Sequence, residues 1–213
     1  DKIIGLSFCF KKGEAFYCPV SEDESILKLY EPFFNHSKIL KIAHNIKFDA
    51  AILKSNDISI DGPIFDTMIA HYLLQPEQRH SMDILAANYL SYKPISIESL
   101  IGKKGKNQKS LNEIPLDVVK DYAAEDADVT FQLYTIFKQL VEEGEINQLF
   151  YEIEMPLSMV LMEMEHEGIR LNTATLSTFS SQLKASIINL KSSIYSHASS
   201  DFNIDSPKQL GDF

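Results

Sequence analysis

A short apolar strand that runs directly into a helix is the feature that most limits the fold of this chain. Residues 39–43 have the composition and length of a buried strand, and a helical pattern begins near Asn45. Upstream, two runs of strand-forming residues, 3–10 and 15–20, flank a turn at 11–14 and predict a β-hairpin. Strands followed this closely by helices indicate an α/β fold, in which helices flank a sheet.

The rest of the chain has mainly helical patterns. Apolar spacing and capping residues predict helices at 25–34, 65–74, 81–89, 116–143 and 154–167, then a long helix capped by Asn172 and a last one opened by Ser206-Pro207. Residues 93–114 contain Pro94, two glycines and a lysine-rich run, so we expect a mobile loop there. The narrow apolar stripe of the helix after Asn172 favours an extended antiparallel helix pair.

Charge and composition narrow the possible functions. The net charge of −10 argues against a protein that holds duplex DNA mainly by its phosphates, because such proteins are basic. It is compatible with a nuclease, since acidic side chains can hold metal ions that contact phosphate. Cys9 and Cys18 are too few for a disulfide framework and indicate a cytoplasmic protein. No apolar stretch is long enough to predict a membrane span.

Asp126 has the position that most suggests a chemical role. On a helical wheel for 116–143 it lies in the middle of the apolar stripe, one turn after Tyr122. Four other acids of this helix point away and are expected to be ordinary solvated charges: Asp117, Asp121, Glu125 and Asp128. A core-facing carboxylate is costly unless it is paired or bound to metal. Pairing with a buried arginine, or capping of a neighbouring backbone, is the structural alternative.

Asp49 lies just after the short strand, in the segment Ala-His-Asn-Ile-Lys-Phe-Asp at 43–49. Sites in α/β folds are built at the carboxyl ends of strands. Asn45 as a plain helix cap, and Asp49 as an acid favoured by the helix dipole, are the alternative interpretations. Together, Asp49, Asp126 and Tyr122 indicate two-metal phosphodiester chemistry, which requires converging carboxylates and a group that orients the attacking water.

Several segments resemble family A DNA polymerases. Residues 45–49 resemble the second exonuclease motif of that family, and 122–128 resemble the third, which has the pattern Tyr-x-x-x-Asp. Further matches lie at 65–68 and 102–108, and at two segments that in this family open the polymerase thumb, 154–157 and 167–171. The resemblance covers essentially the whole chain in order.

This resemblance implies a ribonuclease H-like (DnaQ-like) fold, with a mixed sheet, flanking helices and a missing first strand. Residues 1–152 would be a 3′→5′ exonuclease domain, and 153–213 the start of a polymerase domain with an extended helical thumb segment. The implied activity is proofreading: hydrolysis of the terminal phosphodiester bond at a primer 3′ end. The parent protein would synthesise DNA in replication and repair.

The resemblance also implies roles for individual residues. Asp49 and Asp126 would bind Mg²⁺ or Mn²⁺, which prefer oxygen ligands, and Tyr122 would position the nucleophilic water. Residues expected to contact DNA are Asn45, Lys47, Phe48, Arg79, Ile97, Lys103, Lys104 and Lys106. Ile97 stands where the family is expected to carry an aromatic residue, so stacking on bases would be weaker. The implied partners are single-stranded and primer–template DNA, and the palm and fingers of the same chain, with no membrane.

One departure from the family pattern concerns activity. The family's first motif, Asp-x-Glu, is expected on a strand before residue 1, so two of the four metal-binding carboxylates lie outside this sequence. We therefore expect the chain alone to bind cations weakly and to be nearly inactive as a nuclease. Two other interpretations remain: an exonuclease-like domain that has lost its metal site and serves as a scaffold, and an unrelated α/β protein with a chance Tyr-x-x-x-Asp.

Overall fold

The computed structural model describes residues 2–20, 25–198 and 202–212. The chain divides into two compact units, Asp1–Glu167 and Gly168–Phe213. The larger unit holds all the strands of the described residues and the candidate site, and the smaller unit is helical.

The described strands form two pairs. Strand β1 (Gly5–Lys11) pairs antiparallel with β2 (Glu14–Pro19), which confirms the predicted hairpin. Gly13 in its turn has φ of 78°, a left-handed conformation that favours glycine. Strand β3 (Lys41–Ala43) pairs parallel with β4 (Ile64–Asp66), and helix α3 connects them. Both kinds of pairing therefore occur, as expected for an α/β fold with mixed strand directions.

The helices of the larger unit surround these strands. They are α1 (Ser25–Lys28), α2 (Glu31–Phe34), α3 (Ile46–Lys54), α4 (Thr67–Leu74), α5 (Met82–Leu90), α6 (Ile97–Ile101), α7 (Leu116–Glu143) and α8 (Met155–Glu167). A 3₁₀ turn at Leu111–Glu113 precedes α7, and a π-helical segment at Leu149–Glu154 precedes α8. The long helix predicted at 116–143 has the predicted bounds.

Three local predictions were wrong. The helix expected at 25–34 is two short helices, because Pro32 lacks an N–H and can enter only the first turn of α2. Phe65 and Asp66, expected to be helical, end strand β4, and α4 begins one residue later. The loop expected at 93–114 contains helix α6 and the 3₁₀ turn.

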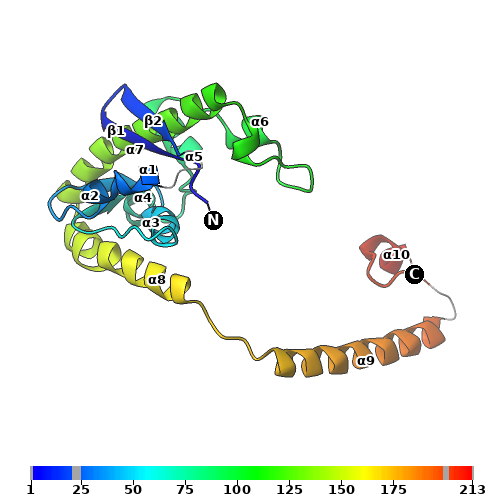
Figure 1. The fold of residues 1–213 in the computed structure, drawn as a ribbon. Helices are drawn as coiled ribbons and strands as arrows, with labels where there is room; N and C mark the ends of the chain where they lie inside the picture. Colours follow the sequence, from blue (N-terminus) through cyan, green and yellow to red (C-terminus); the bar gives the residue numbers. More distant parts are fainter. Residues whose placement is uncertain (1, 21–24, 199–201, 213) are drawn as a thin grey trace. The chain divides into compact units, whose positions relative to one another are not determined.

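Helix α7 is the central element of the larger unit. It packs against the hairpin, β3, α4 and α5 (Figure 1). The main core is formed by its inner face together with residues from β4, α4, α5, the π-helical segment and the start of α8: Phe65, Ala70, Leu85, Ala86, Val129, Leu133, Phe137, Val141, Phe150 and Met155. A second cluster lies under the hairpin: Ile3, Val20, Leu27, Phe34, Leu53 and Ile58. These two cores fix the hairpin and α3 relative to α7.

The smaller unit contains α9 (Thr173–Ala198) and α10 (Pro207–Asp212). Asn172 caps α9 as predicted, because its Oδ1 accepts a hydrogen bond of 3.0 Å from the Thr175 N–H. The apolar stripe of α9 is exposed within this unit: Leu176, Phe179, Leu183, Ile187, Leu190 and Ile194. A second long helix to pair with α9 is not among the described residues 168–198 and 202–212.

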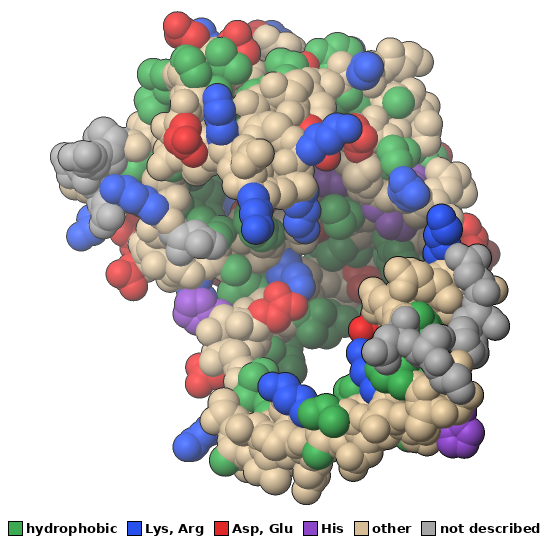
Figure 2. Space-filling model, turned by 90° about the vertical axis from the view of Figure 1, so that its right-hand side faces the viewer, with side chains coloured by type: hydrophobic (Ala, Val, Ile, Leu, Met, Phe, Trp, Pro, Cys, Tyr) green, Lys and Arg blue, Asp and Glu red, His purple; other side chains and the backbone are tan. Residues whose placement is uncertain are grey.

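The cysteines and the apolar character of the helices agree with the sequence-based expectations. Cys9 and Cys18 are both free thiols, as expected. Among the helices of the described residues, none combines the length and the apolar character needed to cross a membrane. Figure 2 shows acidic and basic side chains interspersed over the visible face, and not gathered into one basic band.

Candidate active site

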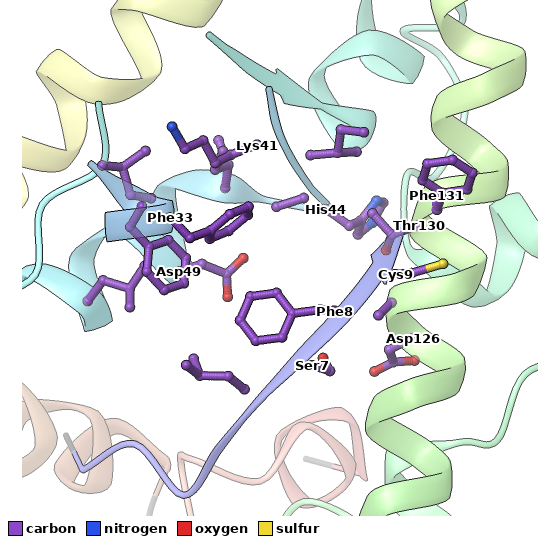
Figure 3. Close-up of a pocket in the computed structure, with 18 of the residues that line it drawn as sticks. Ser7, Phe8, Cys9, Phe33, Lys41, His44, Asp49, Asp126, Thr130 and Phe131 are labelled. Carbon is purple, nitrogen blue, oxygen red and sulfur yellow. The ribbon is translucent and has the colours of Figure 1, made fainter. Parts of the chain in front are cut away.

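Asp49 and Asp126 face the same cavity. It has a volume of about 690 Å³ and is lined by residues of β1, β3, α3 and α7. In Figure 3, Asp49 projects into it from α3 and Asp126 from α7, with Phe8 of β1 between them in that view. The structure therefore places on one cavity two acids that are 77 positions apart (126 − 49) in the sequence.

Asp66 fixes the start of the helix that carries Asp49. Its side chain is 1% exposed. One oxygen accepts from the Asn45 N–H at 3.2 Å, and the other from the Ile46 N–H at 2.8 Å. The first oxygen also accepts from the N–H groups of Met68 and Ile69, at 2.8 and 3.2 Å, in the first turn of α4. One buried carboxylate thus caps both helices.

This arrangement changes the interpretation of Asn45. Its backbone has φ of 71°, in the left-handed region, and its side chain makes no capping hydrogen bond. The plain cap that the sequence allowed for Asn45 is therefore supplied by Asp66, which helix-start patterns cannot reveal because the two residues are 21 positions apart. The side chain of Asn45 is left available for another role.

Asp49 has an unfavourable electrostatic environment. Asp49 is an exposed residue by surface area, but the cavity walls crowd its carboxyl group and partly desolvate it. This desolvation, followed by the negative charge of Asp66, raises the pKa of Asp49 from 3.8 to about 7. Asp49 makes no hydrogen bond or ion pair with any residue that the structure describes.

Asp126 is half-buried beside Tyr122. Burial raises the pKa of Asp126 from 3.8 to about 6, although a hydrogen bond with the Tyr122 side chain opposes the rise. Burial, and then the charge of Asp126, raises the pKa of Tyr122, so the phenol stays protonated at neutral pH. The arginine partner that would have given Asp126 a purely structural role is not found among the described residues, where no ion pair includes Asp126.

The expectation that Glu125 and Asp128 are ordinary solvated charges was wrong. Glu125 accepts hydrogen bonds from the Tyr92 hydroxyl at 2.5 Å and from the Ile95 N–H at 2.6 Å. Asp128 accepts one of 2.7 Å from the N–H of Gly13, in the hairpin turn. All three partners are 30 or more positions away in the sequence, so a wheel of α7 alone cannot place them.

The residues expected to contact DNA fall into two groups. Phe48 lies at the cavity and is 61% exposed. Lys47 follows Ile46 at the start of α3, but its ammonium group lies 2.5 Å from the Glu165 carboxylate of α8. The others do not line the cavity: Arg79 and the lysines Lys103, Lys104 and Lys106 are exposed, and Ile97 is half-buried at the start of α6.

The two cavity carboxylates fit part of a divalent-cation site. Oxygen ligands without a cationic partner suit hard cations such as Mg²⁺. In the described part of the chain, however, no three His, Cys, Asp or Glu side chains gather closely enough to hold a metal ion. Asp49 and Asp126 therefore fit such a site as two members of a larger ligand set.

Comparison with known proteins places this geometry in a family. A family model described as 3′-5′ exonuclease matches residues 1–142. The DNA polymerase I of Borreliella burgdorferi is 37% identical over 216 residues, which cover 98% of this chain and 23% of the relative. The DNA polymerase I of Pseudomonas aeruginosa is 34% identical, covering 99% of this chain and 24% of the relative. The chain thus spans about a quarter of the length of these curated relatives.

Solved structures show the same fold. The POL domain of Pol1 from M. smegmatis, in complex with DNA primer-template and dNTP, has a TM-score of 0.70 and 24% identity, covering 93% of this chain and 31% of that one. NrnC of Brucella melitensis has a TM-score of 0.57 and 23% identity, covering 73% and 72%. The fold is therefore the ribonuclease H-like fold of DnaQ-type exonucleases, and the chain belongs to the 3′-5′ exonuclease family found in DNA polymerase I.

Proposed function

We propose that this chain is the proofreading 3′→5′ exonuclease region of a DNA polymerase I, at residues 1–152, followed by the start of the polymerase domain at 153–213. Its substrate would be the 3′ end of a DNA primer, in the cytoplasm, and the whole protein would also synthesise DNA in replication and repair. The observation that carries the proposal is the pair Asp49 and Asp126, which face one cavity and form no ion pair with any residue that the structure describes.

Asp49 and Asp126 would be ligands for Mg²⁺ or Mn²⁺. When bound, such cations lower the pKa of a coordinated water and stabilise negative charge on the phosphate. The raised pKa values of both carboxyl groups support this assignment, because nearby positive charge would relieve the cost of ionising them. A structure of Brucella melitensis NrnC with bound Mg²⁺ has a TM-score of 0.53 to this chain, which supports the choice of cation.

Tyr122 and the start of α3 would hold the reacting groups in place. The Tyr122 hydroxyl stays protonated at neutral pH, so it can orient a water molecule toward the scissile phosphodiester. Phe48 offers an exposed aromatic face at the cavity, suited to stacking on a terminal base. Asn45 and Lys47, on the same short segment, would contact the terminal nucleotides.

The basic groups away from the cavity would guide the rest of the strand. Arg79 and the lysines at 103, 104 and 106 are exposed, so they are free to contact phosphates at a distance from the cleaved bond. Because the chain has a net charge of −10, it has no general attraction for phosphates, and recognition would depend on these few basic side chains. Ile97 would pack against terminal bases more weakly than an aromatic residue.

The strand pairing supports the expectation that a further strand, outside this sequence, supplies the remaining carboxylates of the site. Among the described strands, β1 pairs only with β2 and β3 only with β4, and both β1 and β3 line the cavity. A further strand between them would pair with both free edges and bring an Asp-x-Glu to the two acids. Without it, we expect weak cation binding and little nuclease activity.

The test uses a full-length protein, which here means a DNA polymerase I that contains this chain as its exonuclease region. Asp126→Ala and Asp49→Ala should each lower Mg²⁺-dependent digestion of a 5′-labelled single strand by orders of magnitude, with polymerase activity retained. Tyr122→Phe should be milder, because both carboxylates remain. Asp117→Ala, at a side chain that is 95% exposed on the same helix, is the matched control. A near wild-type digestion rate in Asp126→Ala would remove that residue from the site.

A scaffold role without catalysis is the second candidate, favoured by the lack of a three-residue metal cluster within the described residues. The two candidates differ in their response to Mn²⁺. An exonuclease site should be stabilised against thermal unfolding by Mn²⁺, and Asp49→Asn should abolish that stabilisation. Equal Mn²⁺ responses of the two proteins would favour the scaffold.

A further inference from the structure

We propose that Glu125 is a positioning residue that ties the segment Tyr92–Ile95 to α7 and so sets where α6, which starts at Ile97, begins relative to Asp126. The inference deepens the proposed exonuclease function and rests on it, because Ile97 is expected to pack against the terminal bases of the DNA. It explains why both carboxylate oxygens of Glu125 accept hydrogen bonds from one segment that is distant in the sequence.

The tether consists of two charge-assisted hydrogen bonds. Oε1 of Glu125 accepts from the Tyr92 hydroxyl at 2.5 Å, and Oε2 accepts from the Ile95 N–H at 2.6 Å. Hydrogen bonds to an ionised acceptor are shorter and stronger than those between neutral groups. Using both oxygens on one segment fixes its orientation as well as its distance from α7.

The tethered segment has few other backbone restraints. Helix α5 ends at Leu90, and the φ of 51° at the next residue, Ser91, turns the chain away from the helix axis. The Tyr92 N–H bonds back to the Ala86 carbonyl, and Pro94 has no N–H to donate. Among the described hydrogen bonds, the Ile95 N–H is paired with Glu125. Loss of this carboxylate would therefore release the path of the chain between α5 and α6.

The contact at Glu125 also affects the candidate site, because both ends of the contact lie close in sequence to residues expected to act there. Ile97, the first residue of α6, is two residues after Ile95 and so lies within about 7 Å of it along the backbone. Glu125 directly precedes Asp126 and lies in the same helical turn as Tyr122. Anchoring Ile95 on Glu125 thus sets where α6 begins relative to the two residues expected to act on the phosphodiester.

Glu125 also carries a negative charge next to Asp126. The effect of this charge must therefore be distinguished from the effect of the two hydrogen bonds to the segment Tyr92–Ile95. Glu125→Ala removes both the charge and the two acceptors. Glu125→Gln removes the charge but keeps a carbonyl oxygen for the Ile95 N–H, and its amide can donate to the Tyr92 oxygen. An effect of charge should appear equally in both variants, and an effect of position in Glu125→Ala alone.

The experiment combines a structural and a kinetic measurement on the full-length protein. Amide hydrogen exchange at Ile95 reports the tether directly, without need of activity. KM and kcat for digestion of a single-stranded oligonucleotide report its effect on substrate binding. We expect Glu125→Ala to speed Ile95 exchange and to raise KM by on the order of tenfold each, with kcat little changed. Glu125→Gln and the control Asp117→Ala should remain close to wild type.

Other results would overturn the proposal. Unchanged exchange at Ile95 in Glu125→Ala would show that the tether does not hold the segment. Equal rises in KM for the Ala and Gln variants would assign the effect to charge, and an unchanged KM with faster exchange would show that the position of α6 does not matter for binding. If the wild-type protein fails to digest DNA, the proposed function fails as well, and faster exchange would then show a purely structural tether.

Discussion

Asp126→Asn should make the metal-free chain more stable at neutral pH. The Asp126 carboxyl has a pKa of about 6 in the folded chain against an ordinary value of 3.8, mainly because burial disfavours its charged form. Because folding raises this pKa, the folded state keeps the proton on Asp126 up to a higher pH than the unfolded state does. Stability is therefore lost as the pH rises from about 4 to about 6, and the loss is complete above that.

The size of the effect follows from the difference in pKa. A gap from 3.8 to about 6 corresponds to an upper limit of about 3 kcal/mol, at about 1.4 kcal/mol per pKa unit. Solvent on the open side of the half-buried side chain screens its charge and reduces this to about 1–2 kcal/mol. Asparagine keeps an oxygen for the Tyr122 hydroxyl and carries no charge, so it should recover most of that free energy.

Urea unfolding in EDTA, at pH 8 and at about pH 4, measures the effect without bound cations. The variant should be more stable than wild type by about 1–2 kcal/mol at pH 8, and the gain should nearly vanish at about pH 4. Asp117→Asn, at an exposed side chain of the same helix, should show no such gain. A variant that is less stable than wild type at pH 8, or a gain that is equal at both pH values, would refute the reasoning.

Further predictions concern residues that support the site. Asp66→Asn should destabilise the chain by about 2–4 kcal/mol in chemical denaturation, because a buried amide cannot accept all the N–H groups that cap α3 and α4; a cost below about 0.5 kcal/mol would contradict the double cap. Asp128→Ala should speed amide exchange at Gly13, whereas Asp121→Ala should not; equal exchange in both variants would mean that Asp128 does not hold the hairpin. Burial lowers the pKa of His71, whose Nδ1 lies 2.7 Å from Nδ1 of His80, so stability should fall as the pH drops below about 6.5, the ordinary histidine value. His71→Gln should flatten that part of the profile of unfolding free energy against pH, and an unchanged slope would exclude His71 as its source.

Local patterns predicted those elements whose signals are complete within the element. Helix α7 has an apolar stripe that continues through its 28 residues, between Pro115 and Gly144, so the sequence defines both of its ends. The hairpin has its turn glycine, and α9 has its capping Asn172. Strand β4 was missed because three residues are too few to show an alternating pattern beside the stronger helical signal of α4.

The candidate site could be predicted in part. The positions of Asp49 and Asp126 follow from the end of a strand and the inner face of a helix, and both signals are local. The double cap by Asp66 and the tether at Glu125 depend on backbone N–H groups from other parts of the chain. Such contacts are fixed only after the cores under the hairpin and along α7 have packed, and a helical wheel contains no information about them.

Anomalous diffraction from crystals of the full-length protein soaked in Mn²⁺ tests the central claim most directly. We expect a Mn²⁺ peak in the cavity, with an oxygen of Asp49 or of Asp126 at about 2.1 Å and the other carboxylate turned toward the same ion or its neighbour. A cavity without such a peak at saturating Mn²⁺, or a peak bound by other residues while the two carboxylates point apart, would contradict it.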